Sequence, residues 1–173
     1  KIQGIGGHGS SPHLANDTIV AGAHFVTAIQ TVVSRRLNPF DMGVITIGSF
    51  DGKGQFNVIK DSVELEGDVR YMTLEVQQLI DKEIHRIVRG IEEEFDVTCE
   101  LEYVPDYPPL HNDPEITGGV VEAIKNSTEP EIKTMTEFPM FSGSEDFAYY
   151  AEKFPSCFFY IGCKPKGVEK PYF

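Results

Sequence analysis

The chain has 173 residues, of which 40% are hydrophobic and 24% are charged, and this composition excludes a disordered or fibrous protein. Its formal net charge of −12, from 15 Lys and Arg and 27 Asp and Glu, makes nucleic acid and anionic membranes unfavourable partners. The length allows one domain, or one domain and part of another.

Three cysteines, Cys99, Cys157 and Cys163, give an odd count with no CxxC pair, which is typical of a reducing compartment. We therefore expect a cytoplasmic protein. No apolar run reaches the roughly 20 residues that a membrane-spanning helix needs, so we expect no membrane association. Because the sequence begins at Lys1 without an initiator Met and reads as a strand almost at once, we also expect residues upstream of it.

The first predicted helix follows a short strand at residues 2–5 and a glycine-rich loop. Asn16 or Asp17 can cap its start, and the pattern continues to about residue 36. Between Asp17 and Arg35 the helix carries no formally charged residue, whereas a solvated helix face normally carries Lys and Glu. This face meets either another protein surface or a loop of its own chain, and the sequence leaves both interpretations open.

In most of the next segments apolar and polar residues alternate, as in strands that are buried on one face. One segment instead has apolar residues at helical spacing. In chain order they predict a strand at 44–50, a turn at 51–54 that closes a hairpin, a strand at 63–71, a helix at 74–95 and a strand at 97–103. The β-α-β-β-α-β order predicts an α+β, ferredoxin-like fold, with a four-stranded antiparallel sheet and both helices on one face. We place the end of this domain at residue 107, among three prolines.

The remaining residues, 108–173, are few for an independent core. They predict a helix at 114–126, a β-prone stretch at 132–136, a short helix at 144–153 and a strand at 157–161. We therefore expect them to be part of a larger α/β domain.

The glycine-rich loop carries two histidines. Residues 4–9 match GxGxxG, but Pro12 intervenes and the helix starts about seven residues late, so the context argues against a dinucleotide site. The glycines instead predict an exposed loop that presents His8 as a metal ligand, a general acid or base, or a hydrogen-bond donor. His8 and His13 are too few ligands for a metal site of their own.

Other residues of functional type have equally simple structural interpretations. Asn57 can cap a turn, and Arg70 can pair with an acidic neighbour across the open face of the sheet. Ser144, followed by Glu145 and Asp146, can start a helix. Taken singly, none of these residues indicates catalysis.

Four segments taken together resemble a known family. They are GGHGSSPH at 6–13, NVIKD at 57–61, EGDVR at 66–70 and SEDF at 144–147. In this order and spacing, and with the β-α-β-β-α-β pattern, the chain resembles the zinc-dependent amidohydrolases of peptidase family M20. The resemblance covers nearly the whole chain, and it points to the branch of hippurate hydrolases, aminoacylases and auxin-conjugate hydrolases, staphylococcal-type amidohydrolases in particular.

The resemblance implies a two-domain enzyme whose ferredoxin-like lid, also its dimerisation domain, is inserted into a catalytic α/β domain with two divalent metal ions. The ions would be zinc, or else manganese or cobalt. Residues 1–107 would be the lid, and residues 108–173 the last part of the catalytic domain. The family's upstream metal-binding motifs and its histidine ligand near the end have no counterpart in this sequence. We therefore expect this chain alone to hold no metal ion and to be inactive.

The resemblance also implies roles for single residues. His8 matches the family's lid histidine, which reaches into the site of the partner subunit of a homodimer and donates a hydrogen bond to the carbonyl oxygen. Asn57 and Arg70 resemble lid residues that bind the carboxylate end of the substrate. A loop that lines the catalytic cleft is matched by Gly143, Ser144, Glu145 and Asp146.

The implied activity is hydrolysis of the amide bond of N-acyl amino acids or small peptides. The alternative is a stand-alone ferredoxin-like module that dimerises or binds a small acid without catalysis. The segment at 144–147 favours the enzyme, because a regulatory module has no need of it.

Overall fold

The structure, a computed structural model, describes residues 1–129, 132, 139–162 and 167. It divides into two units, the first formed by Lys1–Pro109 with Phe141–Gly143 and the second by Leu110–Met140 with Ser144–Phe173. Among the helices that it describes, none is long and apolar enough to cross a membrane.

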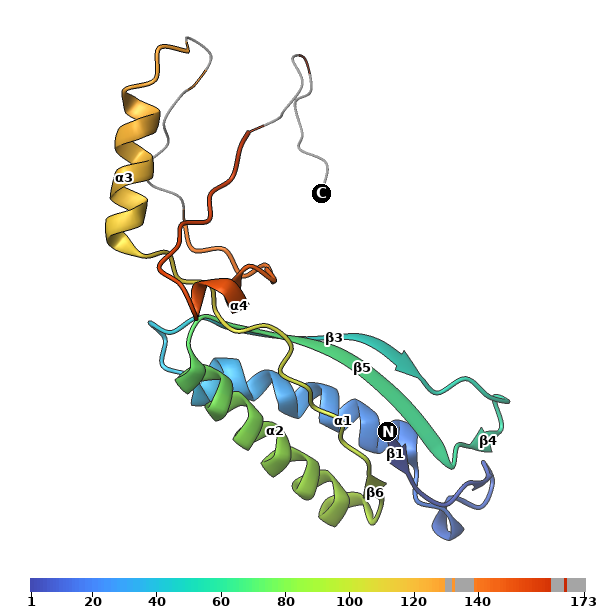
Figure 1. The fold of residues 1–173 in the computed structure, drawn as a ribbon. Coiled ribbons are helices and arrows are strands. Elements are labelled where there is room, and N and C mark those ends of the chain that lie inside the picture. The colour runs from blue at the N-terminus through green and yellow to red at the C-terminus, as the bar shows by residue number, and fades with distance from the viewer. Residues whose placement is uncertain (130–131, 133–138, 163–166, 168–173) are drawn as a thin grey trace. The chain divides into compact units, whose positions relative to one another are not determined.

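The first unit is built on a four-stranded sheet in the order β3-β5-β1-β6 (Figure 1). All its neighbouring strands are antiparallel. The strands are β1 (Ile2–Gln3), β3 (Gly43–Asp51), β5 (Ser62–Tyr71) and β6 (Thr98–Cys99). This order, with a helix after the first and third of these strands, confirms the predicted α+β ferredoxin-like arrangement.

Two helices, α1 (Thr18–Thr31) and α2 (Leu74–Phe95), lie on the same side of this sheet (Figure 1). The Asp17 carboxylate caps α1 by accepting hydrogen bonds from the first turn, and the Thr73 hydroxyl caps α2. The helical path of α1 continues as a π-helix, η2 (Val32–Arg36). Both helices thus span the predicted residues, but the last turn of the first is wider than an α-helical turn.

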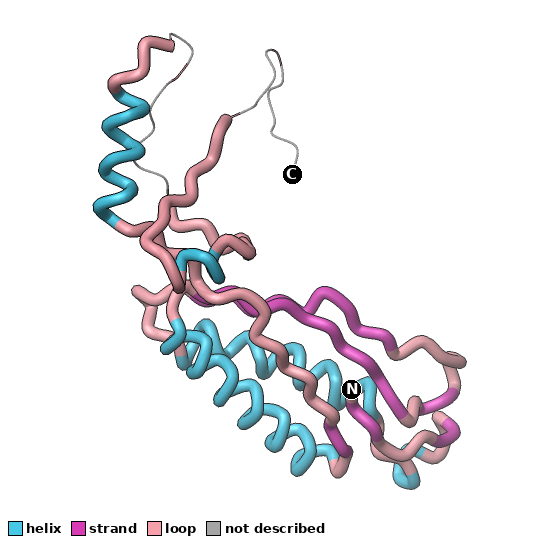
Figure 2. The backbone as a smooth tube through the Cα atoms, viewed as in Figure 1, coloured by secondary structure: helices cyan, strands magenta, loops and turns pink. Residues whose placement is uncertain are grey.

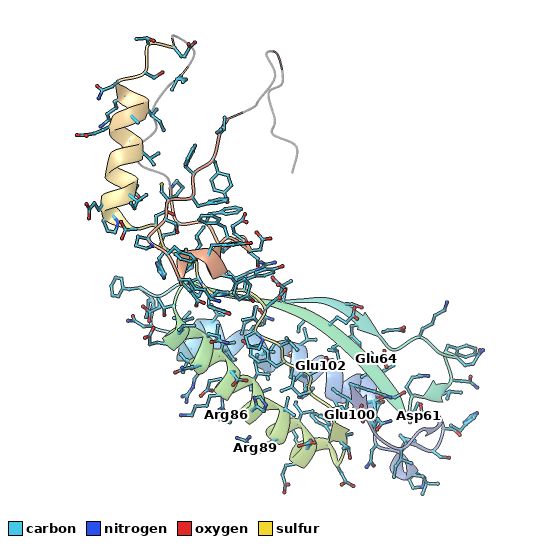
Figure 3. The ribbon with its side chains drawn as sticks, in the orientation of Figure 1. Asp61, Glu64, Arg86, Arg89, Glu100 and Glu102 are labelled. Carbon is cyan, nitrogen blue, oxygen red and sulfur yellow. The ribbon has the colours of Figure 1, made fainter. Side chains whose placement is uncertain are left out.

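The hydrophobic core lies between these helices and the sheet. Its fully buried members include Ile80 of α2, Val32 of η2 and Val63 of β5, and burying each such side chain contributes about 1.5–3 kcal/mol. Residues of β5 that alternate with the core positions face away from the helices; they are Glu64, Glu66, Asp68 and Arg70. Figure 3 shows Arg86 and Arg89 projecting from α2 away from the sheet.

Two details of the predicted sheet are wrong. The last strand was expected over 97–103, but β6 has two residues, which pair with Ile2 and Gln3 of β1. The expected hairpin between β3 and β5 is not a simple turn. Its chain leaves the sheet as β4 (Val58–Ile59), which pairs with β2 (Gly7–His8) in a separate two-stranded ribbon.

The second unit contains α3 (Pro114–Lys125), which confirms the helix predicted at 114–126 and is capped by the Asp113 carboxylate. The helix predicted at 144–153 is only α4 (Ala148–Ala151). Its first hydrogen bonds, such as the one from Ala148 N–H to the Glu145 carbonyl, reach back three residues, the tighter 3₁₀ pattern, so the α-helical turn starts late.

No described residue pairs as a strand with the segment at 157–161, which was predicted to be one. Instead the side-chain amide of Asn112 forms two hydrogen bonds with the backbone of Phe158. Its Nδ2 donates to the Phe158 carbonyl at 2.7 Å, and its Oδ1 accepts from the Phe158 N–H at 2.8 Å. The Asn112 side chain thus makes the backbone hydrogen bonds that a neighbouring strand would make. The predicted β-prone stretch at 132–136 lies, apart from residue 132, outside the described residues.

Candidate functional site

His8 lies in the two-stranded ribbon, and Asn57 lies in the turn immediately before the second strand of the ribbon. His8 is opposite Val58, and the N–H of Gly9 donates to the carbonyl of Asn57 at 2.8 Å. A Cβ on Gly9 would lie 3.0 Å from that oxygen, so a larger residue would push the two strands apart. Because both functional side chains are exposed, they are available to a molecule outside this chain.

The root of the ribbon is tied to the body of the first unit. The N–H of Asn16 donates to the carbonyl of Ile5 at 2.9 Å, and its Nδ2 lies 3.1 Å from the Asp96 carboxylate at the end of α2. On the other strand, the hydroxyl of the buried Thr18 donates to the carbonyl of Lys60 at 2.9 Å. The ribbon therefore has a fixed base and an exposed tip.

The imidazole of His8 is held by its own loop. Its Nδ1 lies 2.8 Å from the Ser10 hydroxyl and 3.2 Å from the Ser10 backbone nitrogen. The N–H of Ser11 donates to the carbonyl of His8 at 2.8 Å, which closes a turn over residues 8–11. Sequence analysis did not predict that Ser10 holds the imidazole of His8, although a hydroxyl two residues after a loop histidine is a signal for this contact.

Arg70 lies far from this pair. It is opposite Val44 near the end of β5, and its Nε donates to the Asp68 carboxylate at 2.6 Å. Arg70 lies eight positions along β5 from Ser62, where the strand starts beside the ribbon, and at about 3.3 Å per residue this is roughly 26 Å. Figure 2 shows the long strand between the two positions. The structure thus brings His8 and Asn57 together and leaves Arg70 apart.

The segment at 143–146 falls on the division of the chain. Gly143 belongs to the first unit, and the residues that follow belong to the second. Gly143, Ser144 and Asp146 are exposed, whereas Glu145 is half-buried and accepts the N–H of Phe147 at 3.3 Å. The place of these four residues in a cleft stays a prediction.

Among the residues that the structure describes, no three His, Cys, Asp or Glu side chains are gathered closely enough to hold a metal ion. A catalytic zinc site needs about three protein ligands. The described residues therefore do not fit the metal ions that the family resemblance implies.

A buried ion cluster lies elsewhere in the first unit, between η2 and α2. The side chain of Glu83 is only 2% exposed, and it accepts two hydrogen bonds of 3.1 Å from Arg36 and one of 2.8 Å from Arg86. The hydrogen bond from Arg36 is the main reason that the pKa of Glu83 is lowered, against the opposing effect of burial. Sequence analysis did not predict this cluster, because the partner Arg36 lies 47 residues away along the chain.

Comparisons with known proteins show which family the chain resembles. The chain matches the model of peptidase family M20/M25/M40 over residues 3–172. It is 37% identical over 172 residues to a provisionally named amidohydrolase, YhaA, of Bacillus subtilis, covering 99% of this chain and 43% of that protein. It is 35% identical over 160 residues to the N-acetyldiaminopimelate deacetylase of Lactococcus lactis, covering 92% and 42% respectively.

A search of solved structures also finds a similar hydrolase. A provisionally named aminohydrolase from methicillin-resistant Staphylococcus aureus superposes with a TM-score of 0.83 and is 57% identical, covering 97% of this chain and 43% of that one. The chain therefore spans less than half the length of the relatives that it matches.

Proposed function

Because the chain belongs to peptidase family M20/M25/M40, we propose that it is part of a metal-dependent amidohydrolase that cleaves N-acyl amino acids or small peptides. The observation that carries the proposal is the family match over residues 3–172, which includes both units of the structure. The names of the two similar proteins, an amidohydrolase and a deacetylase of N-acetyldiaminopimelate, support this substrate class.

Residues 1–107 are the lid in this proposal, and residues 108–173 are part of the catalytic domain. The complete ferredoxin-like sheet within the first unit supports the first assignment. The two divalent ions, zinc or else manganese or cobalt, are bound by residues outside the described part of this chain. The free thiols of Cys99 and Cys157 support the cytoplasm as the compartment. A stand-alone module without catalysis does not account for the family match beyond residue 107.

The lid residues act on the two ends of the substrate. Hydrolysis of an amide builds negative charge on the carbonyl oxygen, and a preorganised donor stabilises that charge. His8 supplies this donor from the exposed tip of a ribbon with a fixed root, and Asn57 beside it supplies a polar contact. Arg70 binds the substrate carboxylate, for which a guanidinium can donate two parallel hydrogen bonds.

The separation of roughly 26 Å between Arg70 and the ribbon supports a division of these residues between two subunits. A single N-acyl amino acid is far too short to contact His8 and Arg70 of the same chain. We infer a homodimer with two-fold symmetry in which each ribbon serves the partner's site, while Arg70 serves the site of its own subunit.

Two features of the first unit support a dimer surface. The hydroxyls of Thr27 and Thr31 on the exposed face of α1 both donate to carbonyls of their own helix, at 2.6 Å, and the helix carries no formally charged residue. Within the described sheet, β3 pairs only with β5, and its nine residues leave one edge for a second copy.

The test uses the full-length protein with zinc and N-acetyl amino acids as substrates. We expect hydrolysis that a chelator abolishes, and we expect His8→Ala to lower kcat by about 10²–10³ without changing the metal content. His13→Ala, in the same loop, is the matched control. Absence of hydrolysis, or wild-type kcat in His8→Ala, would refute the proposed function.

A further inference from the structure

We propose that Ser10 is a positioning residue that holds His8 in the tautomer whose proton is on Nε2. The inference rests on the proposed function, which needs a hydrogen-bond donor at the exposed end of this imidazole.

The turn over residues 8–11 creates the contact. Because the N–H of Ser11 closes the turn on the carbonyl of His8 at 2.8 Å, Ser10 occupies its third position. From there both the hydroxyl and the backbone N–H of Ser10 reach back to the same ring nitrogen, Nδ1 of His8, at 2.8 and 3.2 Å.

The chemistry of these groups fixes the direction of the hydrogen bonds. A backbone N–H can only donate, so Nδ1 is an acceptor and carries no proton. The Ser10 hydroxyl, which can donate or accept, then donates to Nδ1 as well. A neutral imidazole without a proton on Nδ1 carries it on Nε2. The other tautomer would set two N–H groups against each other.

The tautomer decides what His8 offers to a substrate. With its proton on Nε2, the ring presents a donor to a carbonyl oxygen on which negative charge develops. With the proton on Nδ1, the same position would present a lone pair, which repels that charge. Ser10 therefore acts on catalysis only through His8, without touching the substrate.

Ring nitrogen shifts give a direct readout. We would label the histidines of the full-length protein with ¹⁵N and record spectra at about pH 8, where an ordinary imidazole is neutral, assigning His8 by its loss in His8→Gln. We expect the Nδ1 resonance in the range of unprotonated nitrogens and the Nε2 resonance in the range of protonated ones. Ser10→Ala keeps the backbone N–H and loses only the hydroxyl, so both resonances should move part of the way toward their average, and Ser10→Thr should restore them.

Ser11→Ala is the matched control, because the Ser11 side chain makes no capping hydrogen bond to the short 3₁₀-helix η1 (Pro12–Leu14) that follows it. Its ring shifts should equal those of the wild type. A protonated Nδ1 in the wild type would overturn the inference, and so would ring shifts that stay unchanged in Ser10→Ala.

Kinetics of the full-length protein separate this inference from the proposed function. Losing one neutral hydrogen bond to the ring should lower kcat roughly 3- to 10-fold in Ser10→Ala, with little change in KM, and Ser10→Thr should recover it. If the ring shifts move but kcat does not, Ser10 sets the tautomer as inferred, and the proposed catalytic role of His8 is wrong.

Discussion

Mixed dimers of variants at three positions test which residues serve the same catalytic site. His8 and Asn57 share one ribbon, whereas Arg70 lies roughly 26 Å away along β5. In the proposed two-fold dimer, each site therefore takes the ribbon from one subunit and Arg70 from the other. A dimer of one His8→Ala and one Arg70→Ala subunit then has one intact site and one site that lacks both residues.

The expected magnitude follows from this count. Equal amounts of the two variants reassociate to about one-half mixed dimers, so about one site in four is intact and the mixture should reach about a quarter of the wild-type rate. The His8→Ala parent should be slower than wild type by about 10²–10³. A mixture of His8→Ala with Asn57→Ala should stay near the parental rates, because every site in its mixed dimers lacks one residue.

The assay is release of free amino acid from an N-acetyl amino acid after the subunits are mixed in mild denaturant and diluted. Isolating the mixed dimers by two different affinity tags should raise the rate to about half that of the wild type. Recovery in the mixture of His8→Ala and Asn57→Ala would refute the shared ribbon. No recovery in the mixture of His8→Ala and Arg70→Ala would refute the division between subunits.

Three further predictions concern the fold and the dimer. Glu83→Gln removes the charge from three hydrogen bonds and should lower the free energy of unfolding in urea by about 2–3 kcal/mol, whereas the exposed Glu93→Gln should change it by less than about 0.5 kcal/mol. Because Arg36 lowers the pKa of Glu83 below 4.5, this stabilisation is complete above that pH and is lost as the pH falls through the folded-state value, so the urea midpoints of wild type and Glu83→Gln should converge in acid. Replacing Thr27 and Thr31 together by Glu should shift the sedimenting mass toward that of a monomer with the helical content kept; a wild-type chain that already sediments as a monomer at tens of micromolar would contradict the dimer.

Local signals explain why the two long helices could be predicted. Thr73 before α2 is a capping side chain, and the apolar stripe of the helix reaches Ile91 without interruption, so start, length and buried face all follow from nearby residues. The start of α1 could be predicted in the same way, from the capping residue Asp17 and the uncharged helical segment that follows it. The π-helical end was not predictable, because its geometry depends on packing and on Arg36 meeting a carboxylate from another helix.

The candidate site depended on pairings that leave no periodic signal. β2 and β4 have two residues each, too few for an alternation, so the proximity of His8 and Asn57 could not be inferred from their spacing. The family resemblance identified these residues, but the structure was needed to show that Arg70 lies at the other end of its strand.

The acidic row on β5 affects how a substrate arrives. Arg70 stands at the end of a strand whose exposed side also carries Glu64, Glu66 and Asp68, in a chain with a net charge of −12. The proposed substrate, an N-acyl amino acid, is itself an anion, so in this proposal it crosses a repulsive field to reach the guanidinium of Arg70. Salt shortens the range of this field to about 10 Å at 0.1 M. Added salt should therefore accelerate substrate capture, the reverse of the slowing seen where opposite charges guide an encounter.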